Sequence, residues 1–208
     1  MRLKGDILKN IFEEGLLRYL SREQLEKIQS TKIGIAGVGG LGSNIAQILV
    51  RTGFVDFEII DDDIVDSSNL NRQNYFIDEI GLAKVVTTAR RLQKINPAVK
   101  VNVINVRLTK DNLQNFFQDR DVLFEAFDNT ESKIMFLEFF GNTEKLLIFG
   151  NGMSGVVGEE IKIRKMRDNL FIVGDGITEV GKNNPPLAHR VMTCASLMAS
   201  IAIERNLA

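Results

Sequence analysis

The sequence predicts an α/β fold with a mostly parallel sheet, helices on both of its faces, antiparallel strands at its edge and a helical arm at the N-terminus. Three observations predict it. Segments typical of strands and of helices alternate from residue 32 to residue 152, a glycine-rich turn follows the first strand, and residues 1–30 repeat apolar positions at helical spacing. With 208 residues, 44% of them hydrophobic, the chain suits one globular domain and a short arm.

The expected arm covers residues 1–30 and consists of one or two amphipathic helices, which need an outside surface to cover. Its apolar positions are Ile7, Leu8, Ile11, Phe12, Leu16, Leu17 and Leu20. Acidic residues interrupt this pattern, which argues against a signal peptide. Because no run of about 18 apolar residues exists to span a bilayer, we expect a soluble cytoplasmic protein without a membrane partner.

Residues 32–63 predict a strand, a helix and a second strand. KIGIAGVG (32–39) is a short β-branched run that ends in glycines, and SNIAQILVRTG (43–53) follows as a helix that ends at Gly53. DFEIIDDD (56–63) is the second strand. This order predicts two parallel neighbours in one sheet.

Residues 81–118 repeat the alternation after an irregular polar stretch. We expect a helix over 81–95 that ends at Asn96, because a residue before a proline disfavours the helical conformation. VKVNVINV (99–106) predicts a strand, and TKDNLQNFFQ (109–118) predicts a helix with Thr109 as its cap.

The next three elements extend the sheet. DVLFEAF (121–127) predicts a strand, NTESKIMFLEFF (129–140) a helix and KLLIFGNG (145–152) another strand. Alternation of this length favours parallel strands, because each helix returns the chain to the same edge of the sheet.

Beyond residue 152 the pattern changes. EEIKIRKM (159–166) and NLFIVGDG (169–176) are two short strands near a turn, which favour antiparallel additions at the sheet edge. GDGITEVGKNNPP (174–186) is a loop punctuated by glycine and proline, and LAHRVMTCASLMASIAIERN (187–206) is a closing helix.

Glycines gather where the first strand turns into the first helix. They are Gly37, Gly39, Gly40 and Gly42. Without side chains, the backbone amides and the positive helix end can approach a phosphate. Asp61 ends the second strand about 20 residues further on, where a carboxylate can accept both hydroxyls of a ribose. Together these signals indicate a Rossmann-like nucleotide-binding domain over residues 31–208, with the nucleotide still open.

A polar cluster downstream of Asp61 favours ATP over NAD. Its members are Asn69, Arg72, Gln73 and Lys84. A dehydrogenase needs no such cluster, whereas a triphosphate does, because transfer at its α-phosphorus builds charge on oxygens that arginine and lysine neutralise. Of the acidic run, we assign Asp61 to the ligand, keep Asp63 as a further candidate and treat Asp62 as exposed.

Asp128, at the end of the fourth strand, should project to the same edge of the sheet, where it could hold a Mg²⁺ ion that bridges the phosphates. The plainer interpretation is that Asp128 and Asn129 cap the next helix and that Arg72 and Lys84 are solvated surface charges. From the residues alone this choice stays open for Asp128.

Composition narrows the remaining possibilities. A formal net charge of -1 and a pI near 6.0 give no global case for nucleic acid or an anionic membrane. The single cysteine, Cys194, excludes an internal disulfide framework and a cysteine-based structural zinc site. It lies in the apolar pattern of the last helix, so we expect it to be buried and unreactive. His189, near the start of that helix, receives no catalytic role.

Five motifs occur in the order and spacing of a known family: GVGGLGSN, IDDDIVDSSNLNRQ, GLAK, INP and FDN. They resemble the ThiF/MoeB family, relatives of the ubiquitin-activating enzymes, over roughly residues 18–150. The SNLNRQ portion is the most specific. The chain is most similar to the short ThiF-type proteins of bacterial thiamine synthesis, in which GNGMSG and FIVGDG also recur.

The resemblance implies roles position by position. Its ATP-contacting positions match Gly40, Asp61, Asn69, Arg72, Lys84, Asp128 and Asn129. Arg72 and Lys84 would hold the phosphates and Asp128 the Mg²⁺ ion. In a homodimer, an arginine of the arm would reach the ATP of the neighbouring subunit, and RYLSREQ makes Arg22 the better match and Arg18 the second.

The activity that the resemblance implies is adenylation of the C-terminal glycine of a ubiquitin-like sulfur-carrier protein that ends in Gly-Gly. The glycine carboxylate attacks the α-phosphate of ATP and needs no general base, because it is already ionised at neutral pH. Catalysis would rest on positioning two anions and screening their repulsion. We expect this positioning and charge screening to be carried out by four residues, Arg72, Lys84, Asp128 and Arg22.

The sequence departs from many relatives in lacking paired CxxC zinc ligands and a cysteine on the crossover loop. We therefore expect no zinc and no covalent carriage. Three alternatives stay open: an NAD-dependent oxidoreductase, which leaves the polar cluster unexplained; a carrier-binding module without turnover; and adenylation of a carboxylate on a modified tRNA. The near-zero net charge makes nucleic acid the weaker of the possible partners.

Overall fold

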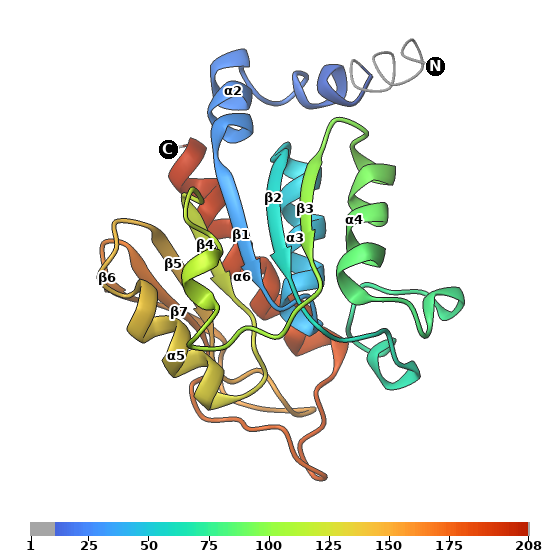
Figure 1. Ribbon diagram of the computed structural model, residues 1–208, viewed down its shortest axis with the longest axis vertical. Helices are drawn as coiled ribbons and strands as arrows, with labels where there is room; N and C mark the ends of the chain where they lie inside the picture. Colours follow the sequence, from blue (N-terminus) through green and yellow to red (C-terminus); the bar gives the residue numbers. More distant parts are fainter. Residues whose placement is uncertain (1–10, 208) are drawn as a thin grey trace.

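The computed structural model describes residues 11–207, whose strands form one sheet with helices on both faces (Figure 1). The strands are β1 (Lys32–Ala36), β2 (Asp56–Ile60), β3 (Lys100–Ile104), β4 (Val122–Glu125), β5 (Leu146–Gly150), β6 (Lys162–Arg167) and β7 (Leu170–Gly174). The α-helices are α2 (Arg22–Ser30), α3 (Gly40–Thr52), α4 (Lys84–Ile95), α5 (Thr130–Phe140) and α6 (Ala188–Leu207), and the 3-10 helices are η1 (Ser67–Asn69), η2 (Ile77–Glu79) and η3 (Leu113–Asn115). The predicted α/β fold is confirmed.

The sheet has the strand order β3-β2-β1-β4-β5-β7-β6. Every neighbouring pair is parallel except β6 with β7. One core cluster joins residues of α2, α3, α4 and α6 to the sheet, and a second joins α5 and η3 to it. Strands β4 and β5 are buried along their whole length, as expected for parallel strands that helices cover on both faces.

The order of the strands reverses between β1 and β4, so the connections that follow these two strands run toward opposite edges of the sheet. After β1 the chain proceeds through α3 to β2, whereas β4, the other neighbour of β1, leads through α5 to β5. In an open α/β sheet, a ligand crevice lies outside the carboxyl ends of the strands at such a switch point. The fold therefore places a site at the carboxyl ends of β1 and β4.

The pairing of β6 and β7 corrects the expectation of two antiparallel strands at the sheet edge. Both edge strands exist, but only β6 is antiparallel, because β7 pairs in parallel with β5. The tight turn after Arg167 makes β6 and β7 a hairpin. The more apolar β7 takes the inner position, and the basic β6 remains at the exposed edge.

The prediction of a helix over 109–118 is wrong, since this stretch contains only the short η3. Thr109 does not cap a helix: its backbone N–H donates to Asn112 Oδ1 at 2.8 Å. Phe117 has a φ of 60° and donates its N–H to the buried Glu58 at 2.7 Å. The apolar positions that resembled a helical face instead belong to a loop that fills the core on the α5 side.

Two further boundaries differ from the expectation. The helix predicted from residue 81 begins at Lys84, because the residues before it pair with the segment after β2: Val65 donates to Leu82, and Gly81, with a φ of 87°, donates to Val65. In the arm, residues 11–16 are helical and α2 follows, capped by Ser21. The expected arm positions Ile7 and Leu8 lie outside the described residues. Among residues 11–207, no helix combines the length and apolar character that crossing a bilayer requires.

Candidate functional site

The turn between β1 and α3 depends on two glycines. Gly37 has a φ of 90°, and a Cβ atom there would lie 3.0 Å from the carbonyl oxygen of Ala126, just after β4. A Cβ atom at Gly42 would collide with the carbonyl oxygen of Gly37. Because both positions are free of side chains, α3 begins directly against the turn, and no side chain caps its first amides. These amides are free to meet an anion.

Asp61 ties the end of β2 to this turn. One carboxylate oxygen accepts the Val38 N–H at 2.7 Å and the other accepts the Asp63 N–H at 2.8 Å. Burial raises the pKa of Asp61, while these two hydrogen bonds and the charge of Lys84 oppose the shift. Each oxygen keeps a second lone pair. Asp61 therefore lies on the expected rim, and its ribose role remains a prediction.

Arg72 follows η1 and approaches the glycine turn. Its Nη1 donates to the carbonyl oxygen of Ser68 at 2.9 Å and to Asn71 Oδ1 at 2.8 Å. Its Cγ lies 3.7 Å from where a Cβ of Gly40 would be. Asn69, buried in η1, accepts the Arg72 N–H through its backbone carbonyl at 3.1 Å. Burial lowers the pKa of the Arg72 guanidinium, and the nearby charge of Asp128 opposes that shift.

Gln73 presents an orphaned acceptor to the same turn. Its side chain is buried, and its Oε1 accepts no hydrogen bond from any described residue. Its Nε2 lies 3.8 Å from where a Cβ of Gly39 would be. A buried polar atom without a partner is costly in a folded protein, so a ligand that donates a hydrogen bond here would relieve that cost.

Lys84 begins α4 and faces the acidic run after β2. Its Nζ lies 2.7 Å from Asp63 Oδ2, and its side chain is only 7% exposed. Asp63, kept as a further candidate, is thus the counterion of Lys84 in this structure. Asp62 is exposed and pairs with Arg107 at 3.1 Å, in agreement with its expected solvated role.

Asn129, and not Asp128, caps α5, and the ligand role of Asp128 remains a prediction. Asn129 Oδ1 accepts the Ser132 N–H at 2.8 Å. Asp128 is exposed and makes no such bond to the helix. Its charge acts on Arg72 across the rim. Asn129 Nδ2 donates to Asp128 Oδ1 at 3.4 Å, and the exposed carboxylate keeps further lone pairs that a ligand could use.

A buried ion pair lies beneath the turn that carries Asp128. Lys133 Nζ lies 2.9 Å from both carboxylate oxygens of Glu125 and donates to the carbonyl oxygen of Gly150 at 2.8 Å. Glu125 is fully buried and also accepts the Phe127 N–H at 2.6 Å. Burial raises the pKa of Glu125, and the charge of Lys133 opposes the shift. This pair fixes the turn from β4 into α5 from below.

Two predicted residues do not join the site of their own chain. Arg22 begins α2, which precedes β1 and therefore lies at the end of the sheet opposite the rim (Figure 1). Arg18 precedes it in the chain, and both side chains are exposed. Whether either arginine reaches a neighbouring subunit remains a prediction.

Two other side chains behave as the sequence indicated. Cys194 is fully buried, and burial raises the pKa of its thiol to about 12, which keeps it protonated and unreactive at neutral pH. His189 lies in the first turn of α6 with a ring nitrogen 3.0 Å from the carbonyl oxygen of Val156.

The sequence analysis did not identify the polar residues behind the glycine turn. Asn44 Nδ2 donates to the carbonyl oxygens of Gly40 at 2.6 Å and Arg72 at 2.9 Å, so it joins the turn to the Arg72 loop. Tyr75 donates its hydroxyl to the carbonyl oxygen of Val38 at 2.7 Å. A signal was available, since Ser43 and Asn44 are two adjacent polar residues at the start of a mostly apolar helix.

Known proteins are similar to this chain over much of its length. The sequence model of the ThiF family matches residues 13–169. The sulfur carrier protein adenylyltransferase of Thermus thermophilus is 30% identical over 151 residues, 72% of this chain and 56% of the relative. The tRNA threonylcarbamoyladenosine dehydratase of Escherichia coli is 30% identical over 145 residues, 69% of this chain and 54% of the relative. The chain spans about half the length of these relatives.

A solved structure matches almost the whole chain. The E. coli tRNA N6-threonylcarbamoyladenosine dehydratase, TcdA, in complex with ATP superposes with a TM-score of 0.85 and covers 95% of this chain and 94% of its own. The two sequences are 22% identical. At this identity the likeness shows a shared fold.

The Glu125–Lys133 pair gives a stability prediction with a definite pH dependence. Lys133→Met leaves Glu125 buried without a cation, and we expect the free energy of unfolding to fall by about 3–5 kcal/mol at neutral pH. Because burial raises the folded-state pKa of Glu125 above 4.5, the folded protein binds a proton more readily than the unfolded chain. The stability of the variant should therefore decrease as the pH rises from 4.5 through that higher pKa.

Urea denaturation at several pH values measures this effect. The control is Lys133→Met combined with Glu125→Leu, which removes both charges and should recover most of the lost stability and lose the added pH dependence. Equal losses in the single and double variants would contradict the assignment.

Proposed function

Because the chain belongs to the ThiF family, whose sequence model matches residues 13–169, we propose that it adenylates the C-terminal glycine carboxylate of a ubiquitin-like sulfur-carrier protein with ATP. One observation carries the proposal. Arg72 lies beside the glycine turn, the charge of Asp128 acts on Arg72, and the charge of Lys84 acts on Asp61, whose carboxylate accepts a hydrogen bond from that turn. Similarity to the Thermus sulfur carrier protein adenylyltransferase supports the choice of substrate. We place the reaction in thiamine biosynthesis because GNGMSG and FIVGDG resemble motifs of the ThiF-type proteins of that pathway.

The residues of the turn fit a nucleotide. The amides at the start of α3 suit a phosphate, Asp61 suits the ribose hydroxyls, and the orphaned Oε1 of Gln73 suits a donor group of the ligand. The solved TcdA structure is a complex with ATP, which supports ATP as the nucleotide. An NAD-dependent oxidoreductase would need the turn and Asp61 but would leave Arg72 and Lys84 without a task.

The present hydrogen-bond partners of Arg72 and Lys84 can be exchanged for phosphate oxygens. Lys84 is paired with Asp63, whose side chain is 59% exposed, and Arg72 donates to a backbone carbonyl and to the amide of Asn71. Triphosphate oxygens carry more charge than these partners. Arg72 therefore gains charge-assisted hydrogen bonds when it exchanges its neutral partners for phosphate oxygens, and Lys84 exchanges one solvent-exposed carboxylate for the more highly charged phosphates.

Asp128 fits a magnesium site. Its carboxylate is exposed, does not cap α5 and acts through its charge on Arg72, and Mg²⁺ in nucleotide sites is bound by one or two carboxylates together with phosphates and waters. Such an ion would neutralise charge on the phosphates. The three carboxylates of Asp61, Asp62 and Asp63 also lie close together, but each already accepts a hydrogen bond or an ion pair.

The chemical step needs no proton transfer. A carboxylate oxygen of the terminal glycine forms a bond to the α-phosphorus, and the bond from that phosphorus to the bridging oxygen breaks. Pyrophosphate leaves with the electron pair, and the glycine becomes an acyl-adenylate. Arg72 and Lys84 lower the barrier by holding the phosphates in line and by offsetting the repulsion between the two anionic reactants. The buried thiol of Cys194 takes no part, so the adenylate is released or passed on.

A second candidate keeps the chemistry and changes the carboxylate. The near full-length structural match to TcdA and the E. coli relative favour a modified tRNA as the acceptor. The net charge of -1 does not favour it, because tRNA binding draws on clustered positive charge. Adenylate formation with a Gly-Gly-ended carrier, measured beside the same assay with threonylcarbamoyladenosine-containing tRNA, separates the two.

Removal of the Lys84 ammonium should abolish most of the activity. We expect Lys84→Ala to reduce carrier-dependent exchange between ATP and pyrophosphate by about 100-fold or more, the size of effect seen when one charge-stabilising donor is removed. Lys100→Ala, a change at an exposed lysine in β3, is the control and should keep the wild-type rate. No carrier-dependent exchange in the wild type would favour a binding module without turnover.

The arm arginine can be tested by mixing two inactive variants. If Arg22 completes the site of a neighbouring subunit in a homodimer, Arg22→Ala and Lys84→Ala each lack activity alone. Mixed after subunit exchange, they should form dimers with one intact site and recover part of the exchange rate. Complete failure of the mixture, with subunit exchange shown by native mass spectrometry, would argue against a shared site.

A further inference from the structure

Residues 74–83, which we call the strap, connect the two basic residues of the proposed site. Arg72 and Gln73 precede the strap and Lys84 follows it. At its start, the Asn74 N–H donates to Ser43 Oγ at 3.0 Å, and at its end Gly81 and Leu82 pair with Val65. The middle of the strap has to be held by something else.

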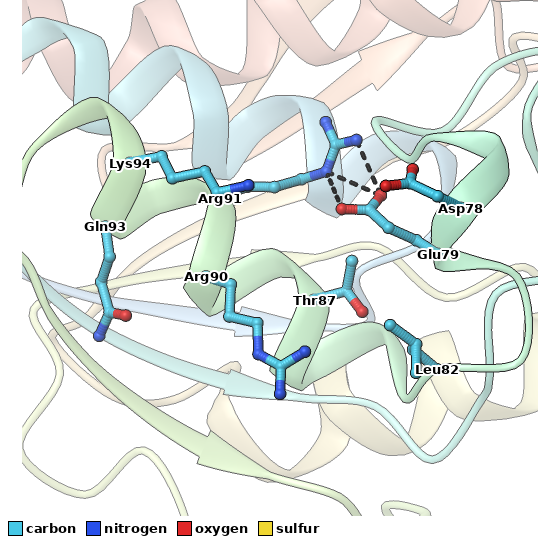
Figure 2. A pocket seen from close by; sticks show the side chains of 8 residues that line it. All are labelled: Asp78, Glu79, Leu82, Thr87, Arg90, Arg91, Gln93 and Lys94. Carbon is cyan, nitrogen blue, oxygen red and sulfur yellow. Dashed lines mark hydrogen bonds and ion pairs between the residues drawn. The ribbon is translucent and has the colours of Figure 1, made fainter.

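Packing holds the strap near its start but not over residues 76–80. Tyr75 is buried, and its hydroxyl oxygen lies 2.7 Å from the Val38 carbonyl oxygen and 3.0 Å from Thr88 Oγ1 of α4. Phe76 is 64% exposed and Ile77 is 78% exposed, so neither side chain is buried in the core. An open hollow of about 410 Å³ lies between the strap and α4, lined on one side by Asp78, Glu79 and Leu82 and on the other by residues of α4 (Figure 2). Hydrophobic burial therefore contributes little to the position of residues 76–80.

One side chain of α4 reaches the strap across this hollow. Figure 2 shows Arg91 directed at Glu79, with Nε 3.0 Å from both carboxylate oxygens and Nη2 2.8 Å from Oε2. Its Nη1 donates to Asn74 Oδ1 at 3.2 Å, and its guanidinium carbon lies 3.6 Å from the centroid of the Phe76 ring. Glu79 Oε2 also accepts the Phe76 N–H at 2.7 Å. Arg91 thus contacts the strap at three residues.

The Arg91–Glu79 ion pair is largely shielded from solvent, which strengthens it. The two side chains are 10% and 15% exposed, and the fork of the guanidinium matches the carboxylate. Burial raises the pKa of Glu79, but the hydrogen bonds from Arg91 and Phe76 outweigh it and leave the pKa below its ordinary value. Glu79 therefore stays ionised at neutral pH, and the contact persists.

The geometry of α4 connects this pair to the site. Lys84 and Arg91 are seven residues apart, close to two helical turns, so they lie on the same side of one rigid helix. We propose that Arg91 and Glu79 are positioning residues that fix the strap against α4 and thereby set the spacing of Arg72 and Lys84 for the phosphates of the nucleotide. This inference rests on the proposed function, which assigns the phosphates to those two residues.

The test compares two variants with control variants at adjacent positions. Glu79→Gln keeps the shape of the side chain and loses its charge, and Arg91→Lys keeps the charge and loses the fork. The controls are Asp78→Asn and Arg90→Lys, which make the same chemical changes at exposed adjacent residues that form no ion pair within residues 11–207. Thermal melting shows that each full-length variant is folded at the temperature of the assay.

Calorimetric titration with ATP·Mg and separately with adenosine gives the decisive readout. We expect the Kd for ATP to rise about tenfold in Glu79→Gln and Arg91→Lys, equal to about 1.4 kcal/mol of binding free energy. The Kd for adenosine should not change, because adenosine has no phosphates, and both controls should match the wild type. A general loss of structure would instead weaken ATP and adenosine alike.

The outcomes separate this inference from the function on which it rests. Wild-type affinity for ATP in both variants, or a parallel loss of ATP and adenosine, would overturn the positioning role alone. A wild-type protein that binds no ATP would overturn the proposed function, and the positioning role with it.

Discussion

The close passage of the chain from β1 into α3 is the constraint on which the site depends. Gly37 and Gly42 leave no room for side chains, so the first amides of α3 point to the rim of the sheet. Three neighbouring segments are attached to this turn: Asp61 through the Val38 N–H, Tyr75 through the Val38 carbonyl and the Arg72 loop through Asn44. A turn with side chains would displace all of these contacts together.

Charges around this turn fall into two groups with different surroundings. Glu125 with Lys133 and Glu79 with Arg91 are shielded pairs that hold a turn and a strap in place. Lys84 and Arg72 instead have partners that are exposed or uncharged. Removing one member of a shielded pair leaves an unpaired charge, whereas a partner open to solvent can be exchanged at lower cost. The site thus combines fixed supports with cations that are ready to change partners.

The sequence predicted the strands well, because buried parallel strands appear as apolar runs. It also predicted which polar residues follow the carboxyl ends of β2 and β4, since those ends share one edge of the sheet, and the roles of these residues remain predictions. It could not predict the loop over 109–118, where an N–H of Phe117 binds Glu58, which lies 59 positions earlier in the chain. The same limit hid the contact of Arg91 with Glu79 and that of Asn44 with Arg72, since no local pattern reports a partner that only the fold brings near. The acceptor of the adenylyl group is harder still to predict, because the roles proposed for Arg72 and Lys84 would be the same for any carboxylate.

The central claim is that Lys84 and Arg72 exchange their present partners for phosphate oxygens. A crystal structure with Mg²⁺ and a non-hydrolysable ATP analogue tests it most directly. The account predicts the triphosphate over the start of α3, with Lys84 Nζ moved from Asp63 to a phosphate oxygen and the Arg72 guanidinium in contact with the phosphates. A triphosphate that lies away from both side chains, with the Lys84–Asp63 ion pair intact, would contradict it.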